Sequence, residues 1–153
     1  MASIAEPLYK LLKENSVFCW EKEQIKSFEE IKKILTSEDV SYFSPKDENL
    51  FDPGGDVKAV LLGNVQAINY CDYIIAVTDG KDVGTIFEAG YAYAKGVPIL
   101  YVWLSRQPGQ KFNVMLGGSG EVVHTYEDLA TQIRHRATTG MFMKTTDSGI
   151  IYE

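Results

Sequence analysis

The sequence has little of what secreted, membrane-spanning or metal-binding proteins need. It contains two cysteines, and Cys19 and Cys71 form neither a disulfide framework nor a CxxC metal pair. No apolar run approaches the ~18 residues of a membrane span, and the first residues lack the apolar core of a signal peptide. We therefore expect a cytoplasmic protein with no membrane partner, no metal and no cofactor.

Positive charge is also scarce. The net charge of -6 argues against binding to a nucleic-acid backbone, although it does not exclude a small nucleoside. His124 and His135 lie on different predicted elements without other metal-ligating residues at suitable spacing, so we expect surface or packing roles for both. No repeat, low-complexity tract or linker divides the 153 residues, which predicts a single domain spanning residues 1–153.

Short apolar runs alternate with amphipathic segments along the chain. The predicted strands are residues 16–20, 40–43, 73–78, 97–104 and 122–125, and the predicted helices are residues 7–14, 25–35, 56–70, 85–95 and 125–135. This alternation predicts an α/β fold: a single doubly wound, flavodoxin- or Rossmann-like domain with a parallel five-stranded sheet flanked by helices. Ligands of such sheets bind beyond the carboxyl ends of the strands, so the loop after Thr78 is the place to look for chemistry.

The segment DVGTIFEAGYA, which begins at Asp82, allows two interpretations. Thr85 and Glu88 have the spacing of a capping box, which would be a structural role. Alternatively, Glu88 in a first helical turn would be kept ionised by the helix dipole and could attack an anomeric carbon, with Asp79 and Asp82 accepting hydrogen bonds from sugar hydroxyls. No glycine-rich phosphate-binding motif occurs, and the GGSG sequence at residues 117–120 predicts a flexible turn.

A family resemblance favours the second interpretation. Residues 82–84 (DVG) and 88–92 (EAGYA) resemble the signature of nucleoside 2-deoxyribosyltransferases and related nucleotide N-glycosidases. Three further matches follow the family's order: SPKD at residues 44–47, NVM at residues 113–115, and the C-terminal ending GIIY at residues 149–152. The resemblance runs from about Val40 to the C-terminus.

The resemblance implies a role for each matching residue. Glu88 would be the nucleophile that forms a covalent deoxyribosyl ester, Asp82 and Gly84 would line the pocket, and Tyr152 would approach the nucleophile. Asn113, with Met115 in the same motif, would come from a neighbouring subunit and bind the sugar 5′-hydroxyl. The implied protein is therefore a homo-oligomer with shared active sites, acting on a deoxynucleoside and a nucleobase.

Two positions complete the expected site, and one of them departs from the family. Asn49 stands roughly where the family holds an amide that reads the base. Asn64 stands where the family usually has an aspartate that helps to protonate the departing base, and an amide cannot serve as a general acid. Three functions therefore stay open: transfer of 2-deoxyribose between bases, hydrolysis of the N-glycosidic bond, and binding of a nucleoside or nucleotide without turnover.

Overall fold

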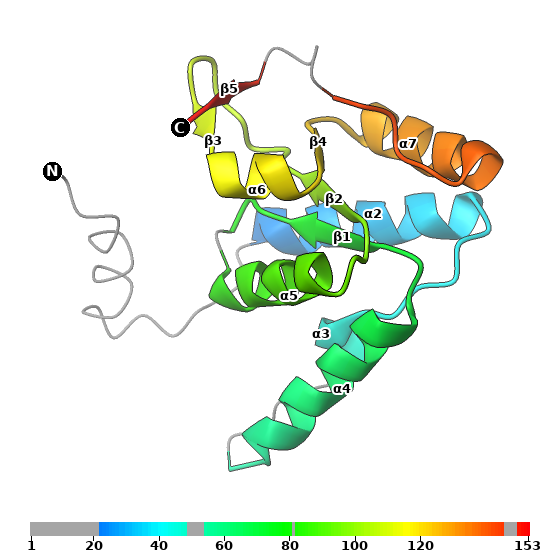
Figure 1. Ribbon diagram of the computed structural model, residues 1–153, viewed down its shortest axis with the longest axis vertical. Helices are drawn as coiled ribbons and strands as arrows, with labels where there is room; N and C mark the ends of the chain where they lie inside the picture. The colour runs from blue at the N-terminus through cyan, green and yellow to red at the C-terminus, as the bar shows by residue number, and fades with distance from the viewer. Residues whose placement is uncertain (1–21, 49–53, 81, 146–149) are drawn as a thin grey trace, which may run out of the picture.

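Helices enclose a small parallel sheet in the computed structural model (Figure 1), which describes residues 22–48, 54–80, 82–145 and 150–153. In chain order the elements are α2 (Lys22–Ser37), α3 (Pro45–Glu48), α4 (Val57–Tyr70), β1 (Ile74–Val77), α5 (Val83–Ala94), β2 (Ile99–Val102), β3 (Lys111–Phe112), α6 (Val114–Ser119), β4 (Glu121–Val123), α7 (Tyr126–Thr139) and β5 (Ile151–Tyr152). In these described ranges no helix has the length and apolar character to cross a membrane. The cytoplasmic location and the single domain stay predictions.

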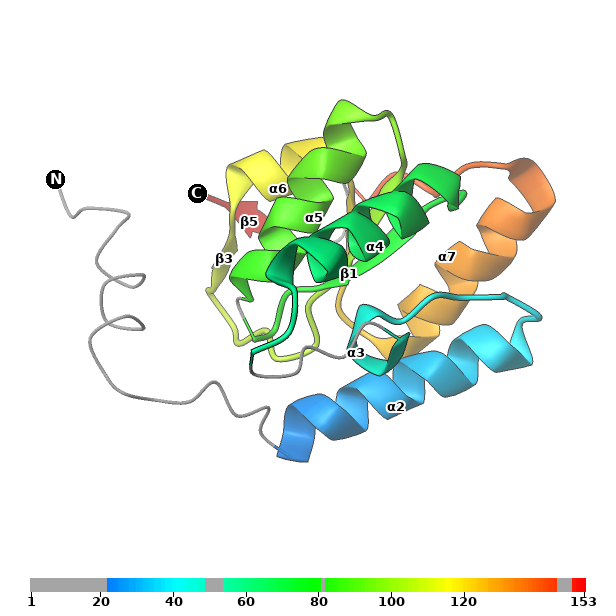
Figure 2. The same cartoon turned by 90° about the horizontal axis from the view of Figure 1, so that it is seen from below.

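The central sheet has the strand order β1-β2-β4, and both strand pairs are parallel. Side chains alternate between its two faces, as the pleat of a strand requires. On one face Ala76, Tyr101 and Val122 pack against α4, α5 and α6, and on the other face Leu100 and Val123 pack against α2 and α7. Figure 2 shows this arrangement, with α4 and α5 on one side of β1 and α2 and α7 on the other.

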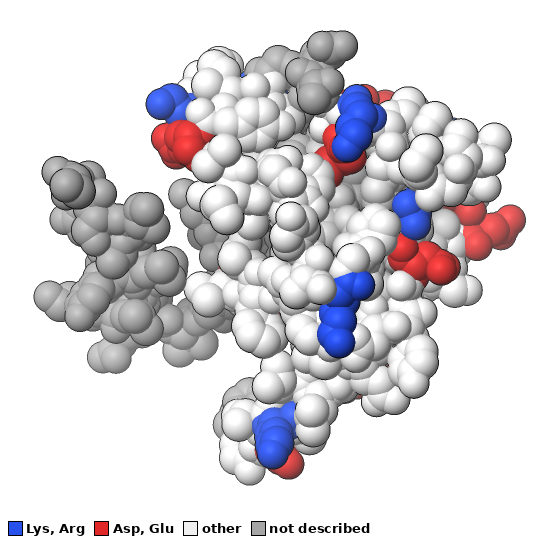
Figure 3. All heavy atoms as spheres, in the orientation of Figure 1, with Lys and Arg blue, Asp and Glu red and all other residues white. Residues whose placement is uncertain are grey.

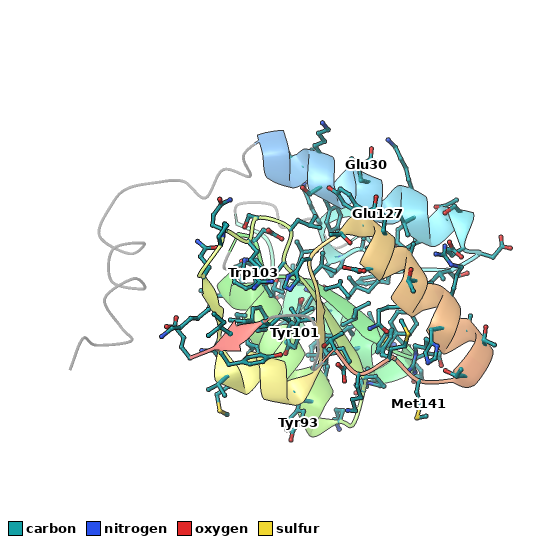
Figure 4. The ribbon with its side chains drawn as sticks, turned by 90° about the horizontal axis from the view of Figure 1, so that it is seen from above. Glu30, Tyr93, Tyr101, Trp103, Glu127 and Met141 are labelled. Atoms are coloured by element: carbon teal, nitrogen blue, oxygen red, sulfur yellow. The ribbon has the colours of Figure 1, made fainter. Side chains whose placement is uncertain are left out.

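This arrangement confirms the α/β class and the placement of helices on both faces of a parallel sheet. The buried centre is built largely by β2, whose four residues are all inaccessible to solvent. Tyr101 and Trp103 accordingly lie between the layers in Figure 4, whereas Tyr93 and Met141 lie at the periphery. A strand that is apolar at every position, with cover on both faces, is what the sequence around residues 97–104 predicts.

The sheet differs from the single five-stranded sheet that we expected. The described residues form two parallel sheets, one of three strands and one of two, in which β3 pairs with β5. The predicted strand at residues 40–43 is not formed: Tyr42 and Phe43 are exposed, and Val40 instead hydrogen-bonds back to Leu35 at the end of α2. The predicted helix at residues 7–14 and strand at residues 16–20 lie outside the described residues.

Short polar residues fix the starts of the main helices. Asp56 caps α4 by accepting hydrogen bonds from the backbone N–H groups of Lys58 and Ala59, as the sequence predicts. Thr125 caps α7 in the same way, with its hydroxyl accepting from Asp128 N. Gly96 ends the turn after α5 with a φ of +73°, a backbone conformation that glycine adopts without strain.

Candidate active site

Glu88 lies in the second turn of α5, directly after the carboxyl end of β1. The helix begins at Val83, two residues earlier than the sequence suggested, so Glu88 is not in the first turn and the helix dipole does not account for its charge. Ala89 and Ala92 face the sheet and are buried. Successive helix residues are ~100° apart, so Glu88 lies beside this buried face and reaches towards α4, on which Asn64 stands.

An amide from the neighbouring helix holds the Glu88 carboxylate. Asn64 Nδ2 donates to Glu88 Oε1 at 2.8 Å, across a contact between α4 and α5. Burial raises the pKa of Glu88 above its usual value; the hydrogen bond from Asn64 opposes this rise, and the negative charge of Asp82 adds to it. The Glu88 carboxyl is therefore half-buried, oriented by one donor and more basic than a solvated glutamate.

Asp82 occupies the N-cap of α5. Its Oδ2 atom accepts from the backbone N–H of Thr85 at 2.8 Å and from the Thr85 hydroxyl at 2.9 Å. The predicted capping box of Thr85 with Glu88 is therefore wrong: Asp82 supplies the cap, and Glu88 is free of that structural task. At Gly84 an added Cβ would lie 3.2 Å from Asp82 Oδ2, so a side chain there would crowd this carboxylate.

Asp79 follows β1, and its side chain is hydrogen-bonded to the loop that follows β2. Its carboxylate accepts hydrogen bonds from the backbone N–H groups of Leu104, at 3.1 Å, and Ser105. The carboxyl ends of the two neighbouring strands are thereby joined. The contacts place Asp79 as an acceptor within the loops, and its predicted role as a ligand of sugar hydroxyls stays a prediction.

A second group of predicted site residues lies at α6 and β5. Asn113 caps α6 by accepting from the backbone N–H groups of Met115 and Leu116, and Met115 is 77% exposed. The ring of Tyr152 lies against Gly117, where an added Cβ would be 2.2 Å from the ring. The first three residues of the GGSG sequence belong to α6 rather than to the flexible turn that we predicted. The glycine at position 117 leaves the space that the Tyr152 ring occupies.

The structure brings together only part of the predicted site. Glu88, Asn64 and Asp82 with Gly84 meet between α4 and the start of α5. In the described part of the chain, Glu88 is bonded to Asn64, whereas Asn113 is bonded to the start of α6 and Tyr152 lies against Gly117. Asn49 lies outside the described residues. The part of the chain that the structure describes has no cluster of three or more His, Cys, Asp or Glu side chains suited to a metal.

The sequence of this chain matches a known protein family. A family model described as nucleoside 2-deoxyribosyltransferase matches residues 16–115. The chain belongs to this family. The matched range contains Asn64, Asp82, Glu88 and the Asn113 motif, whereas Tyr152 lies beyond it.

Two solved structures share the fold of this nucleoside 2-deoxyribosyltransferase family member. A 2-deoxyribosyltransferase from Bacillus psychrosaccharolyticus is 22% identical with a TM-score of 0.62, over 72% of this chain and 84% of that chain. A conserved protein from Enterococcus faecalis V583 is 23% identical with a TM-score of 0.64, over 79% of this chain and 94% of that chain. At such identities the likeness shows the fold. No sequence among the curated proteins matches the chain.

Some supporting residues of this family member were not predicted from its sequence. Thr85 holds Asp82, and the hydroxyl of Tyr91 donates to Asn69 Oδ1 at 2.9 Å, which adds a second polar link between α4 and α5. A signal was present for the link between α4 and α5. Asn64 and Asn69 stand on the helix before β1, and the start of α5 follows that strand, so the topology predicts that the two helices can meet.

Proposed function

We propose that this protein transfers 2-deoxyribose between nucleobases through a covalent ester on Glu88. One observation carries the proposal: the half-buried Glu88 carboxylate is held by Asn64 at 2.8 Å at the carboxyl end of β1. An oriented, partly desolvated carboxylate can act as a nucleophile towards an anomeric carbon. The position agrees with the rule that ligands of doubly wound sheets bind beyond the strand ends.

The proposed reaction has two displacements at the same carbon. A carboxylate oxygen of Glu88 bonds to C1′ while the bond to the first base breaks, and the second base then attacks C1′ and releases Glu88. Asp82 and Gly84 line the pocket, Asp79 and Asn49 contact the sugar and the base, and Tyr152 approaches the nucleophile. Because Glu88 must be ionised to attack, turnover should fall as the pH drops through its raised pKa.

Incubation with deoxyinosine, with and without adenine, tests this function. A new deoxynucleoside formed only when adenine is present demonstrates transfer, and free hypoxanthine formed without adenine demonstrates hydrolysis. The matched control is Glu88→Gln, which keeps an oxygen to accept the Asn64 hydrogen bond but removes the nucleophile. Wild-type rates in this variant would refute the Glu88 mechanism.

Binding without turnover is the alternative that Asn64 favours, because an amide gives no proton to a departing base. Under that alternative, deoxyinosine binds, and its binding is measurable by calorimetry, but neither hypoxanthine nor a new nucleoside forms. The same incubation therefore separates all three functions.

We also propose that the active protein is a homo-oligomer whose sites are completed by a second copy. The outer side of α5, on the helix that carries Glu88, exposes Val83, Ile86, Phe87 and Tyr93 to solvent. In Figure 3 the face that carries α5 and α6 is mainly uncharged. An exposed apolar surface of this kind is typical of a protein interface, and docking of a second copy here would cover it next to the nucleophile.

The shared site makes a mixing experiment possible. Asn113→Asp keeps a side-chain oxygen that can accept the hydrogen bonds capping α6, now as a carboxylate, but removes the amide hydrogens that would bind a 5′-hydroxyl. Mixing Glu88→Gln subunits with Asn113→Asp subunits should restore activity, since some sites then combine an intact Glu88 with an intact Asn113. A fully active monomer in sedimentation, or no recovery on mixing of folded variants, would rule out the shared site.

A further inference from the structure

The group that faces Glu88 is a hydrogen-bond donor that cannot give up a proton. Asn64 stands in the middle of α4 and donates through Nδ2 to Glu88 Oε1 at 2.8 Å. An amide donor stabilises the ionised carboxylate, which suits a nucleophile, but it cannot protonate a leaving group. The contact therefore stabilises the carboxylate that attacks C1′. It supplies no proton to the departing base.

The two aspartates near Glu88 serve as acceptors for donors on the chain. Asp82 accepts twice from Thr85, and Asp79 accepts from two backbone N–H groups of the loop after β2. In these contacts both side chains serve as hydrogen-bond acceptors. In these contacts neither aspartate, nor the Asn64 amide, offers a proton to a base bound against Glu88.

The Asp82 carboxylate at the N-cap of α5 adds negative charge beside Glu88 in the second turn of the same helix. Asp82 lies close enough to Glu88 for its charge to contribute to the raised pKa of the glutamate. A negative potential that disfavours a further negative charge favours a positive one, by the same Coulombic interaction. A ligand that carries a positive charge near C1′ would thus be bound and, at the moment of reaction, would approach an anionic nucleophile.

We propose, resting on the proposed Glu88 mechanism, that the preferred donors are 2′-deoxyribosides whose glycosidic ring nitrogen carries a positive charge, such as pyridinium deoxyribosides. The Glu88 oxygen bonds to C1′ as the C1′–N bond breaks, and the bonding pair passes to the ring nitrogen and cancels its charge. A neutral heterocycle leaves, and no proton is needed. Attack on C1′ by a nucleobase or by water, which loses its proton to solvent, then frees the Glu88 carboxylate.

A comparison of two donors tests this substrate class. Release of nicotinamide from nicotinamide 2′-deoxyriboside and of hypoxanthine from deoxyinosine is measured by chromatography for the wild-type protein, each as an acceleration over the uncatalysed rate at the same pH. We expect the acceleration to be at least ~10²-fold greater for the pyridinium donor, which is the lower end of what general-acid help contributes to a reaction that needs it. Equal accelerations, or a greater one for deoxyinosine, would overturn the inference.

Asn64→Asp should change the preference in the opposite direction. A carboxyl at position 64 would face Glu88 at hydrogen-bond distance, so the two carboxyl groups would share a proton. That proton could then be donated to a neutral base. We expect the rate on deoxyinosine to rise by ~10²–10⁴-fold with a new pH dependence, and the rate on the pyridinium donor to stay level or fall. Unchanged relative rates in the folded variant would contradict the inference, and the wild-type comparison decides the matter if this variant does not fold.

Two controls separate this inference from the proposed function. Asn69→Asp adds the same charge to the same helix and keeps an acceptor for Tyr91, so it should leave the donor preference unchanged. Glu88→Gln should abolish turnover of both donors. If Glu88→Gln retains activity, the Glu88 mechanism itself is wrong; if Glu88 is essential but deoxyinosine is the better donor, only the leaving-group inference fails.

Discussion

Asp79 and Glu88 lie nine positions apart at the same end of β1, yet their surroundings differ. The Asp79 carboxylate accepts from two backbone N–H groups and joins the loops after β1 and β2. The Glu88 carboxylate accepts from a side chain, Asn64, and burial raises its pKa. Asp79 therefore links the loops that follow two strands, whereas Glu88 is oriented by a side chain alone.

This difference indicates which acid is placed for chemistry. A carboxylate that accepts from two backbone N–H groups stabilises the fold through charge-assisted hydrogen bonds. A carboxylate that is partly buried with a raised pKa costs the fold stability, a condition often found at functional sites.

The largest expected effect is on turnover. Glu88→Gln should reduce kcat on the order of 10³-fold or more, because the amide cannot form the ester. Asp79→Asn should reduce kcat per folded molecule by no more than about tenfold, because its amide oxygen can still accept from a sugar hydroxyl and takes no part in the ester. Steady-state kinetics with circular dichroism as a folding control measures both. Equal losses in two folded variants would break the contrast between these acids.

A smaller effect is expected on stability, and here the larger change should come from Asp79 rather than from Glu88. Asp79→Ala should lower the free energy of unfolding by about 2–3 kcal/mol, since two backbone donors lose a charged acceptor. Asp79→Asn, which keeps one acceptor oxygen, should lose less. Urea denaturation of both variants provides the measurement, and an Asp79→Ala protein as stable as the wild type would show that these hydrogen bonds contribute nothing.

The smallest effect is a pH-dependent gain in stability on removing Glu88. Its raised pKa means that the folded state binds this proton more tightly than the unfolded state, so folding loses stability as the pH rises through the folded pKa. Glu88→Gln should therefore be more stable than the wild type at neutral pH, and the difference should vanish near the pKa of an unfolded glutamate. Melting temperatures from pH 4 to 8, with Glu48→Gln as an exposed control, would show it; a gain that is independent of pH would contradict the linkage.

Much of the architecture was predictable because it depends on local pattern. The cap at Asp56, the buried run of β2 and the helical spacing of Ile31 and Leu35 each follow from residue type and period. Strand pairing was less predictable: β3 and β5 have two residues each and carry no periodic signal. Their pairing depends on contacts between Phe112 and the C-terminal end of the chain.

The sequence indicated which residues form the candidate site, but it did not indicate which of them contact one another. The spacing of Thr85 and Glu88 fitted a capping box, but Asp82 outcompetes Glu88 because its shorter side chain reaches Thr85 directly from the N-cap. The meeting of Asn64 with Glu88 depends on how α4 packs on α5, which no local pattern specifies. Family resemblance places Asn64 near the base; the structure shows its contact with Glu88, and its place beside the base stays a prediction.

Trapping the intermediate tests the central claim most directly. The protein is mixed with excess deoxyinosine in the absence of an acceptor base, quenched in acid, digested and examined by mass spectrometry. We expect a 2-deoxyribosyl group on the peptide that contains Glu88, located on that residue by fragmentation and absent from Glu88→Gln. Turnover accompanied by a deoxyribosyl group on a different residue, with Glu88 unmodified, would contradict it.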